Sequence, residues 1–77
     1  MTQHLRNINL KTFREYLEWK GLKMIRTKGG HEIWSRKDLS RPVIIQTHIS
    51  PVPEFIVKQV LRNIGANIED FITFLKS

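Results

Sequence analysis

The segment Arg26-Thr27-Lys28-Gly29-Gly30-His31 predicts a tight β-hairpin in the first half of this 77-residue chain. Two glycines join two extended runs, and two-residue hairpin turns favour glycine because their backbone needs positive φ. In such a hairpin Lys28 and His31 lie directly opposite each other, and Arg26 shares their face of the sheet. A side chain that exchanges protons near neutral pH is therefore expected beside two charges that attract phosphate.

Helical and extended patterns on both sides of the hairpin predict the element order α-β-β-β-α-α. Asn9 and Asn67 are placed to cap the first and last helices, and Gly21 and Gly65 to end the first two. A run of strands between helices predicts an α+β fold, with a three-stranded antiparallel sheet and helices on one face. The expected elements are a helix over 10–20, strands over 22–28, 31–36 and 43–48, and helices over 54–64 and from 68 onward.

The alternation of side chains suggests which face of the sheet is covered. We favour exposing the face that carries Arg26, Lys28 and His31, because Ile25 and Trp34 then oppose each other in the core. Met24, Ile33 and Ser35 fall on the exposed face in this interpretation, and a one-residue bulge would reverse it. Both tryptophans, Trp19 and Trp34, are expected to serve the core.

Charge is concentrated in one half of the chain. Lys and Arg number 13 against 7 acids, which gives a net charge of +6. Residues 1–41 hold ten basic and four acidic side chains, and residues 42–77 hold three of each. A concentrated positive field on a small domain favours a nucleic acid or another polyanion as partner, although a basic surface without a ligand is the alternative.

Composition excludes several classes of protein. The chain has no cysteine, so neither a disulfide framework nor a thiolate zinc site supports it. No apolar run approaches the ~20 residues of a membrane span, and the N-terminus lacks the apolar core of a secretory signal. We therefore expect a cytoplasmic protein with one domain over residues 9–77 and a flexible segment over residues 1–8, in which His4 has no role.

A family resemblance rests on an ordered set of residues. Gly21-Leu22, Arg26-x-x-Gly29-x-His31, a third strand ending in His48, and Leu61-Arg62-x-Ile64-Gly65 together resemble the HicA-type mRNA interferases. These are the toxins of HicA–HicB toxin–antitoxin pairs. The resemblance covers residues 9–75. It implies a fold similar to the double-stranded RNA-binding domain, and a metal-independent ribonuclease whose catalytic histidine lies in a Gly-Ser-His motif.

Site residues follow from that resemblance. Gly29 and His31 match the motif, Gly30 stands in place of its serine, and His31 becomes the general acid or base that cleaves RNA. His48 is a second acid–base partner, a phosphate ligand, or only a residue that ends a strand. The residues expected to bind RNA are Arg26, Lys28, Gly29, Gly30, Arg36, Lys37, Arg41 and His48. Arg36, Lys37 and Arg41 are included for their charge alone, and the alternative for these three is a solvated charged turn.

The resemblance also implies partners. These are an mRNA substrate and a HicB-type antitoxin that covers the basic face, with the free toxin a monomer. We expect no metal and no cofactor, because His31 and His48 lack carboxylate or cysteine partners at ligand spacing. The alternative function is a non-catalytic RNA-binding module of similar fold, which would not need His31. A small DNA-binding domain is disfavoured, since no helix is rich in base-reading polar residues.

Overall fold

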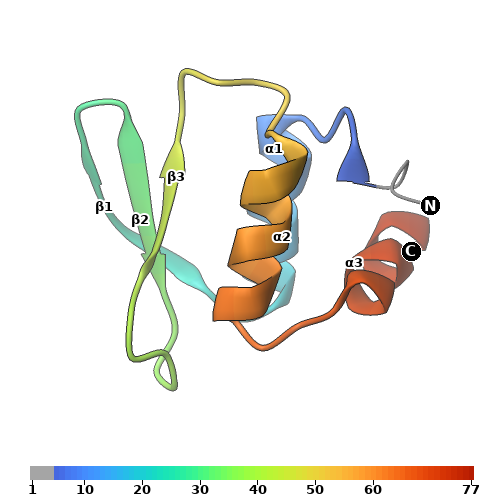
Figure 1. Cartoon of the computed structure of the whole chain (residues 1–77). Coiled ribbons are helices and arrows are strands. Elements are labelled where there is room, and N and C mark those ends of the chain that lie inside the picture. The colour runs from blue at the N-terminus through green and yellow to red at the C-terminus, as the bar shows by residue number, and fades with distance from the viewer. Residues whose placement is uncertain (1–4) are drawn as a thin grey trace.

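In the computed structural model, which describes residues 5–77, a three-stranded antiparallel sheet packs against two helices, and a third helix lies behind them (Figure 1). The strand order is β1-β2-β3, so β1 and β3 are the edges. The predicted α+β class and element order are confirmed. The elements are α1 (Leu10–Trp19), β1 (Lys23–Lys28), β2 (His31–Ser35), β3 (Val43–Gln46), α2 (Glu54–Asn63) and α3 (Ile68–Lys76).

The helix boundaries follow the predicted signals. Asn9 Oδ1 accepts a hydrogen bond from the backbone N–H of Thr12 at 2.8 Å, and Asn67 Oδ1 caps α3 in the same way. Gly21 and Gly65 follow α1 and α2 with φ of +86° and +74°. Side chains other than glycine rarely adopt this left-handed conformation, so both glycines end their helices as expected.

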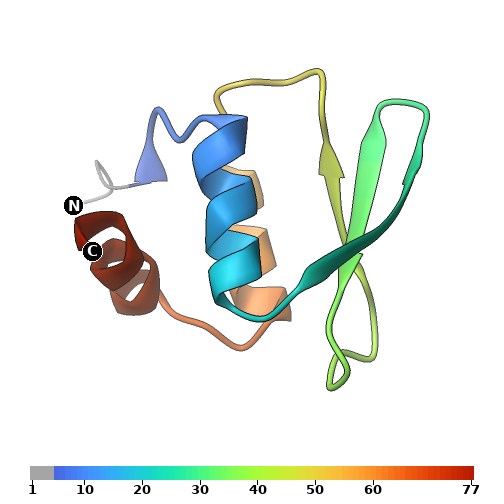
Figure 2. The same cartoon turned by 180° about the vertical axis from the view of Figure 1, so that it is seen from behind.

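One hydrophobic core joins the three layers, and aromatic side chains within it pack α3 onto α1. Figure 2 shows α1 and α2 between the sheet and α3, as in Figure 1. Tyr16 on α1 packs edge-on against Phe71 of α3, with ring centroids 4.7 Å apart, and its hydroxyl donates to Asp70 Oδ2 at 2.7 Å. Burial, together with this hydrogen bond, raises the pKa of Tyr16. Trp19 is half-exposed against Phe74, so the expectation of a core position is wrong for Trp19.

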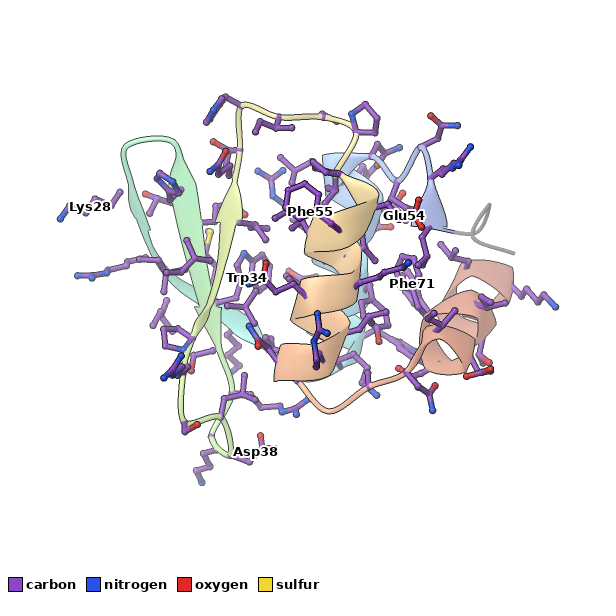
Figure 3. The ribbon with its side chains drawn as sticks, viewed as in Figure 1. Lys28, Trp34, Asp38, Glu54, Phe55 and Phe71 are labelled. Atoms are coloured by element: carbon purple, nitrogen blue, oxygen red, sulfur yellow. The ribbon has the colours of Figure 1, made fainter. Side chains whose placement is uncertain are left out.

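A bulge in β1 changes the predicted pairing of the hairpin. The register shifts between Met24 and Arg26, and Met24, not Ile25, lies opposite Trp34. Ile25 is more than half exposed, whereas Trp34 is buried between the sheet and α2 (Figure 3). The expected Ile25–Trp34 core pair is therefore wrong. The bulge moves only the start of β1, so Arg26 still pairs with Ile33 on the face away from the helices.

Two expected boundaries also need correction. Leu5 and Ile8 are buried, and Ile8 forms a β-bridge with Val52, so residues 5–8 are not the flexible segment expected there. Residues 1–4, including His4, lie outside the described residues. The third strand ends at Gln46, and His48 lies in the turn that follows it. Between residues 5 and 77, no helix is long and apolar enough to cross a membrane.

Candidate active site

The candidate catalytic histidine lies in a row of three side chains across the sheet. Lys28 pairs with His31 in β1 and β2, and His31 pairs with Gln46 in β3. Paired residues project from the same face, and Trp34 and Ile45, which face the core, show that this row lies on the opposite face. We call this helix-free side of the sheet the outer face. Figure 3 shows Lys28 pointing away from the helices.

A second row of paired residues lies on the outer face, two residues along each strand from the first row. Arg26, Ile33 and Ile44 are paired across the three strands. Ile33 is buried but does not belong to the main hydrophobic core. Its side chain on the outer face is therefore shielded by neighbouring side chains of that face. Arg26 and Lys28 are exposed, and neither forms an ion pair within residues 5–77. Their charges are therefore available to a phosphate beside His31.

The Gly29-Gly30 turn brings the second histidine to the same end of the sheet. Gly29 has φ of +60° and Gly30 does not have positive φ, the combination found in type II′ turns. Thr47 donates from its backbone N–H to Gly30 O at 2.7 Å, which extends the pairing of β2 and β3. A Cβ at position 30 would lie 3.1 Å from His48 Nδ1. Glycine at this position therefore leaves room for the His48 ring, and a larger side chain would require the ring to move.

An ion pair anchors β2 directly behind His31. Glu32 is 6 % exposed and faces the helices, where Arg14 of α1 holds its carboxylate with both Nε and Nη2. Trp34 Nε1 donates to the same carboxylate at 3.1 Å. These hydrogen bonds, that of Arg14 first, lower the pKa of Glu32 despite its burial. The network fixes the strand that presents His31 on its other face.

Acid should weaken this anchor. The folded pKa of Glu32 lies below its ordinary 4.5, so its contribution to stability is complete above about pH 4.5 and is lost as pH falls through the folded pKa. We expect the free energy of unfolding, measured by urea denaturation, to decrease from roughly pH 5 to pH 3. Glu32→Gln should lower the free energy of unfolding at pH 7 by about 1–2 kcal/mol. The loss stays modest because Arg14 is partly exposed and water can solvate its charge. The variant should also show a smaller decrease in stability between roughly pH 5 and pH 3.

A matched variant separates this effect from the general response to acid. Glu15→Gln removes an exposed carboxylate from α1, and its stability should follow the wild-type dependence on pH. Hydrogen bonds from Tyr16 and Lys20 lower the pKa of Asp70, so both variants should still lose some stability as the pH falls. Parallel pH curves for Glu32→Gln and the wild type would contradict the role given to Glu32.

Three expected RNA-binding cations do not lie beside His31. Arg36 donates to the backbone carbonyl oxygens of Lys20 at 2.8 Å and Ile64 at 3.2 Å, at the ends of α1 and α2, and it also pairs with Asp38. Its donors are thus used within the fold. Lys37 and Arg41 are exposed in the connection between β2 and β3. The five residues of β2 place that connection roughly 15 Å from His31, at the other end of the sheet (Figure 1).

Gln46 is a site residue that sequence reasoning missed. It lies directly opposite His31 on the edge strand, where its amide can both donate and accept a hydrogen bond. The sequence indicated a third strand but not its register against the second, and that register decides which residue becomes the neighbour of His31. The outer face thus combines a proton-exchanging imidazole, two cations and an amide, with His48 beside the turn.

These groups can bind a phosphate and move a proton. Within residues 5–77 no three His, Asp or Glu side chains gather into a group that could hold a metal ion. The expectation of metal-independent chemistry stays a prediction.

No protein-family model matches the chain, and none of the curated proteins or solved structures matches it either. The class established here is a small α+β domain with an exposed basic sheet face.

Proposed function

We propose that this chain is a HicA-type mRNA interferase, a toxin that cleaves mRNA without a metal ion. The observation that carries the proposal is the row Lys28–His31–Gln46 on the outer face, with Arg26 in the adjacent row. The imidazole is exposed, and the cations beside it form no ion pair with any residue from 5 to 77. This arrangement is suited to a phosphodiester, because the imidazole can exchange a proton while the cations hold the charged phosphate. The fold we propose is similar to that of the double-stranded RNA-binding domain.

The proposed reaction uses the RNA's own 2′-hydroxyl. His31 accepts the proton of this hydroxyl as its oxygen attacks phosphorus, and the bond to the 5′-oxygen breaks. Lys28 and Arg26 stabilise the charge that develops on the phosphate oxygens. The products are a 2′,3′-cyclic phosphate and a 5′-hydroxyl, whose proton comes from a second acid. The position of the His48 ring beside Gly30, the residue before His31, supports His48 as that acid or as a further phosphate ligand.

The outer face also suits the partner of this toxin class. A HicB-type antitoxin that presents acidic groups to Arg26 and Lys28 would cover His31 and exclude RNA. The free toxin is proposed to be a cytoplasmic monomer. Binding of the antitoxin and of RNA should then be mutually exclusive.

The proposed docking surface can be tested by reversing charges. In the inactive His31→Ala form, changing Arg26 and Lys28 to Glu should weaken RNA binding at least tenfold and reduce the slope of log K against log salt by about 1.4, since each lost phosphate contact with a single strand removes about 0.7. The same reversal at Lys58 and Arg62 of α2 changes the net charge equally but alters no residue of the outer face.

A fluorescence titration with single-stranded RNA at several salt concentrations measures both quantities. The control pair should lose less affinity and keep a slope close to that of the parent. Equal losses for the two pairs would show that RNA responds only to net charge and does not dock on the outer face.

A further inference from the structure

An apolar groove runs along the edge strand β3, with His31 at its rim. It encloses about 230 Å³ between β3, the loop that follows it and the start of α2. We call it the β3 groove. Its lining includes His31, Ile44, Gln46, Ile49, Pro53 and Phe55.

The walls of the β3 groove expose an unusual amount of apolar surface for so small a chain. Phe55 is 69 % exposed and Ile44 57 % exposed, and Ile49 adds further apolar area. Figure 3 shows Phe55 at the N-terminal end of α2. Exposed apolar side chains that gather in one place mark a binding site more often than single ones do. The groove therefore calls for a ligand with an apolar face.

The charges around the groove indicate which ligand that is. Lys28 lies opposite His31 at one end, and Arg41 lines a second depression that shares Ile44 and Ile56 with the groove. Among the described residues, none of those that line the two depressions is acidic. Glu54, next to Phe55 in the chain, pairs instead with Arg6 and Lys58. An apolar trough with cations at both ends fits an unpaired nucleic-acid strand, which alternates flat bases with phosphates.

We propose that the β3 groove receives one unpaired nucleobase of the RNA, beside the phosphate held at His31. This proposal rests on the proposed function and adds its substrate class, an RNA cut next to an unstacked nucleotide. Sites for drug-sized ligands enclose roughly 300–1,000 Å³, so 230 Å³ suits a single flat ring system. Phe55 stacks on the base, and Gln46 contacts a polar edge of it, while His31 remains free for the 2′-hydroxyl. A base paired in a helix cannot enter, so duplex RNA is a poor substrate.

The test combines a protein variant with a modified RNA. Phe55→Ala should lower kcat/KM about tenfold on a single-stranded oligonucleotide, mainly by raising KM, because stacking contributes to binding. A set of oligonucleotides carries one abasic position moved along the strand. At the position that enters the groove, the wild type should lose at least as much activity as Phe55→Ala costs, and the variant should lose clearly less than the wild type does.

Matched variants control for folding and for general loss of apolar surface. Ile68→Ala alters an exposed apolar residue on α3, outside the groove, and should cleave as the wild type does. Phe55→Tyr keeps an aromatic face and should restore most of the activity. Each variant should give the wild-type circular dichroism spectrum.

Binding by the His31→Ala form separates failure of this proposal from failure of the proposed function. In that background Phe55→Ala and the abasic position should weaken RNA binding together, whether or not the wild type cleaves RNA. If neither change affects binding or cleavage, or if their losses multiply, the base subsite is wrong. If the groove binds a protein partner instead, neither Phe55→Ala nor the abasic position should affect RNA binding or cleavage. If the wild type binds RNA as expected but does not cleave it, only the proposed nuclease activity is contradicted, and the base subsite stands.

Discussion

Expression of the wild-type chain should arrest bacterial growth and deplete mRNA, whereas the His31→Ala chain should be tolerated at the same protein level. A positioned general acid or base contributes roughly 10²–10⁴-fold to a reaction rate, so its removal should reduce cleavage to a rate that cells withstand. His31 is exposed on the outer face and makes no side-chain hydrogen bond among residues 5–77, so the fold should not depend on it. Growth curves and mRNA sequencing after induction measure the difference.

Two controls make this result specific. The His31→Ala protein should unfold at the same temperature as the wild type, which separates lost chemistry from lost structure. Lys58→Ala, which changes an exposed cation outside the outer face, should remain toxic. Equal toxicity of the wild type and His31→Ala would contradict the catalytic role. It would favour the alternative of a non-catalytic RNA-binding module.

RNA with a blocked 2′-hydroxyl at the cleaved position should resist the protein completely, although it still binds. The proposed nucleophile is that hydroxyl, so a 2′-deoxy or 2′-O-methyl sugar removes the attacking group and leaves the phosphates for Lys28 and Arg26. Because the proposed chemistry uses only side chains and the substrate, cleavage of the unmodified RNA should continue in excess chelator. Its products should carry a 2′,3′-cyclic phosphate, or the 3′-phosphate that follows from it, and a free 5′-hydroxyl.

Matched oligonucleotides that differ only in the sugar at one position provide the measurement. A metal-assisted attack by water commonly leaves a 5′-phosphate and does not need the 2′-hydroxyl. Cleavage of the blocked RNA would therefore contradict the histidine mechanism. Activity that is lost in chelator and restored by magnesium would contradict it as well.

Local signals in the sequence were sufficient for most of the fold. Asn9 caps a helix through the N–H three residues away, and Gly21 ends it through its own backbone conformation, so neither depends on distant contacts. The β1 bulge was not predictable in the same way. Met24 and Ile25 are both apolar, and only the register of β1 against β2 decides which of them pairs with Trp34. The burial of Ile8 likewise depends on its bridge to Val52, far along the chain.

In the candidate site, too, the features set by local contacts were predictable and those set by distant contacts were not. A two-residue turn fixes Lys28 opposite His31, and this pairing was predicted and is confirmed. Gln46 at the end of β3 and His48 in the turn after it are placed by a register across a longer connection, so which residue of this segment lies opposite His31 could not be predicted from the sequence. The structural role of Arg36 could not be predicted, because two of its acceptors, the carbonyl oxygens of Lys20 and Ile64, are 16 and 28 positions away. Only its pairing with Asp38 is local.

The central claim is that His31 performs metal-independent cleavage of RNA. The most direct test is the single-turnover rate constant for one unmodified RNA, measured in excess chelator with purified wild type and His31→Ala at saturating protein. The proposed mechanism predicts that the wild type cleaves and that the variant is slower by roughly 10²–10⁴-fold while it binds the RNA equally well. Equal rate constants for the two proteins, or no cleavage by the wild type, would contradict the proposed mechanism.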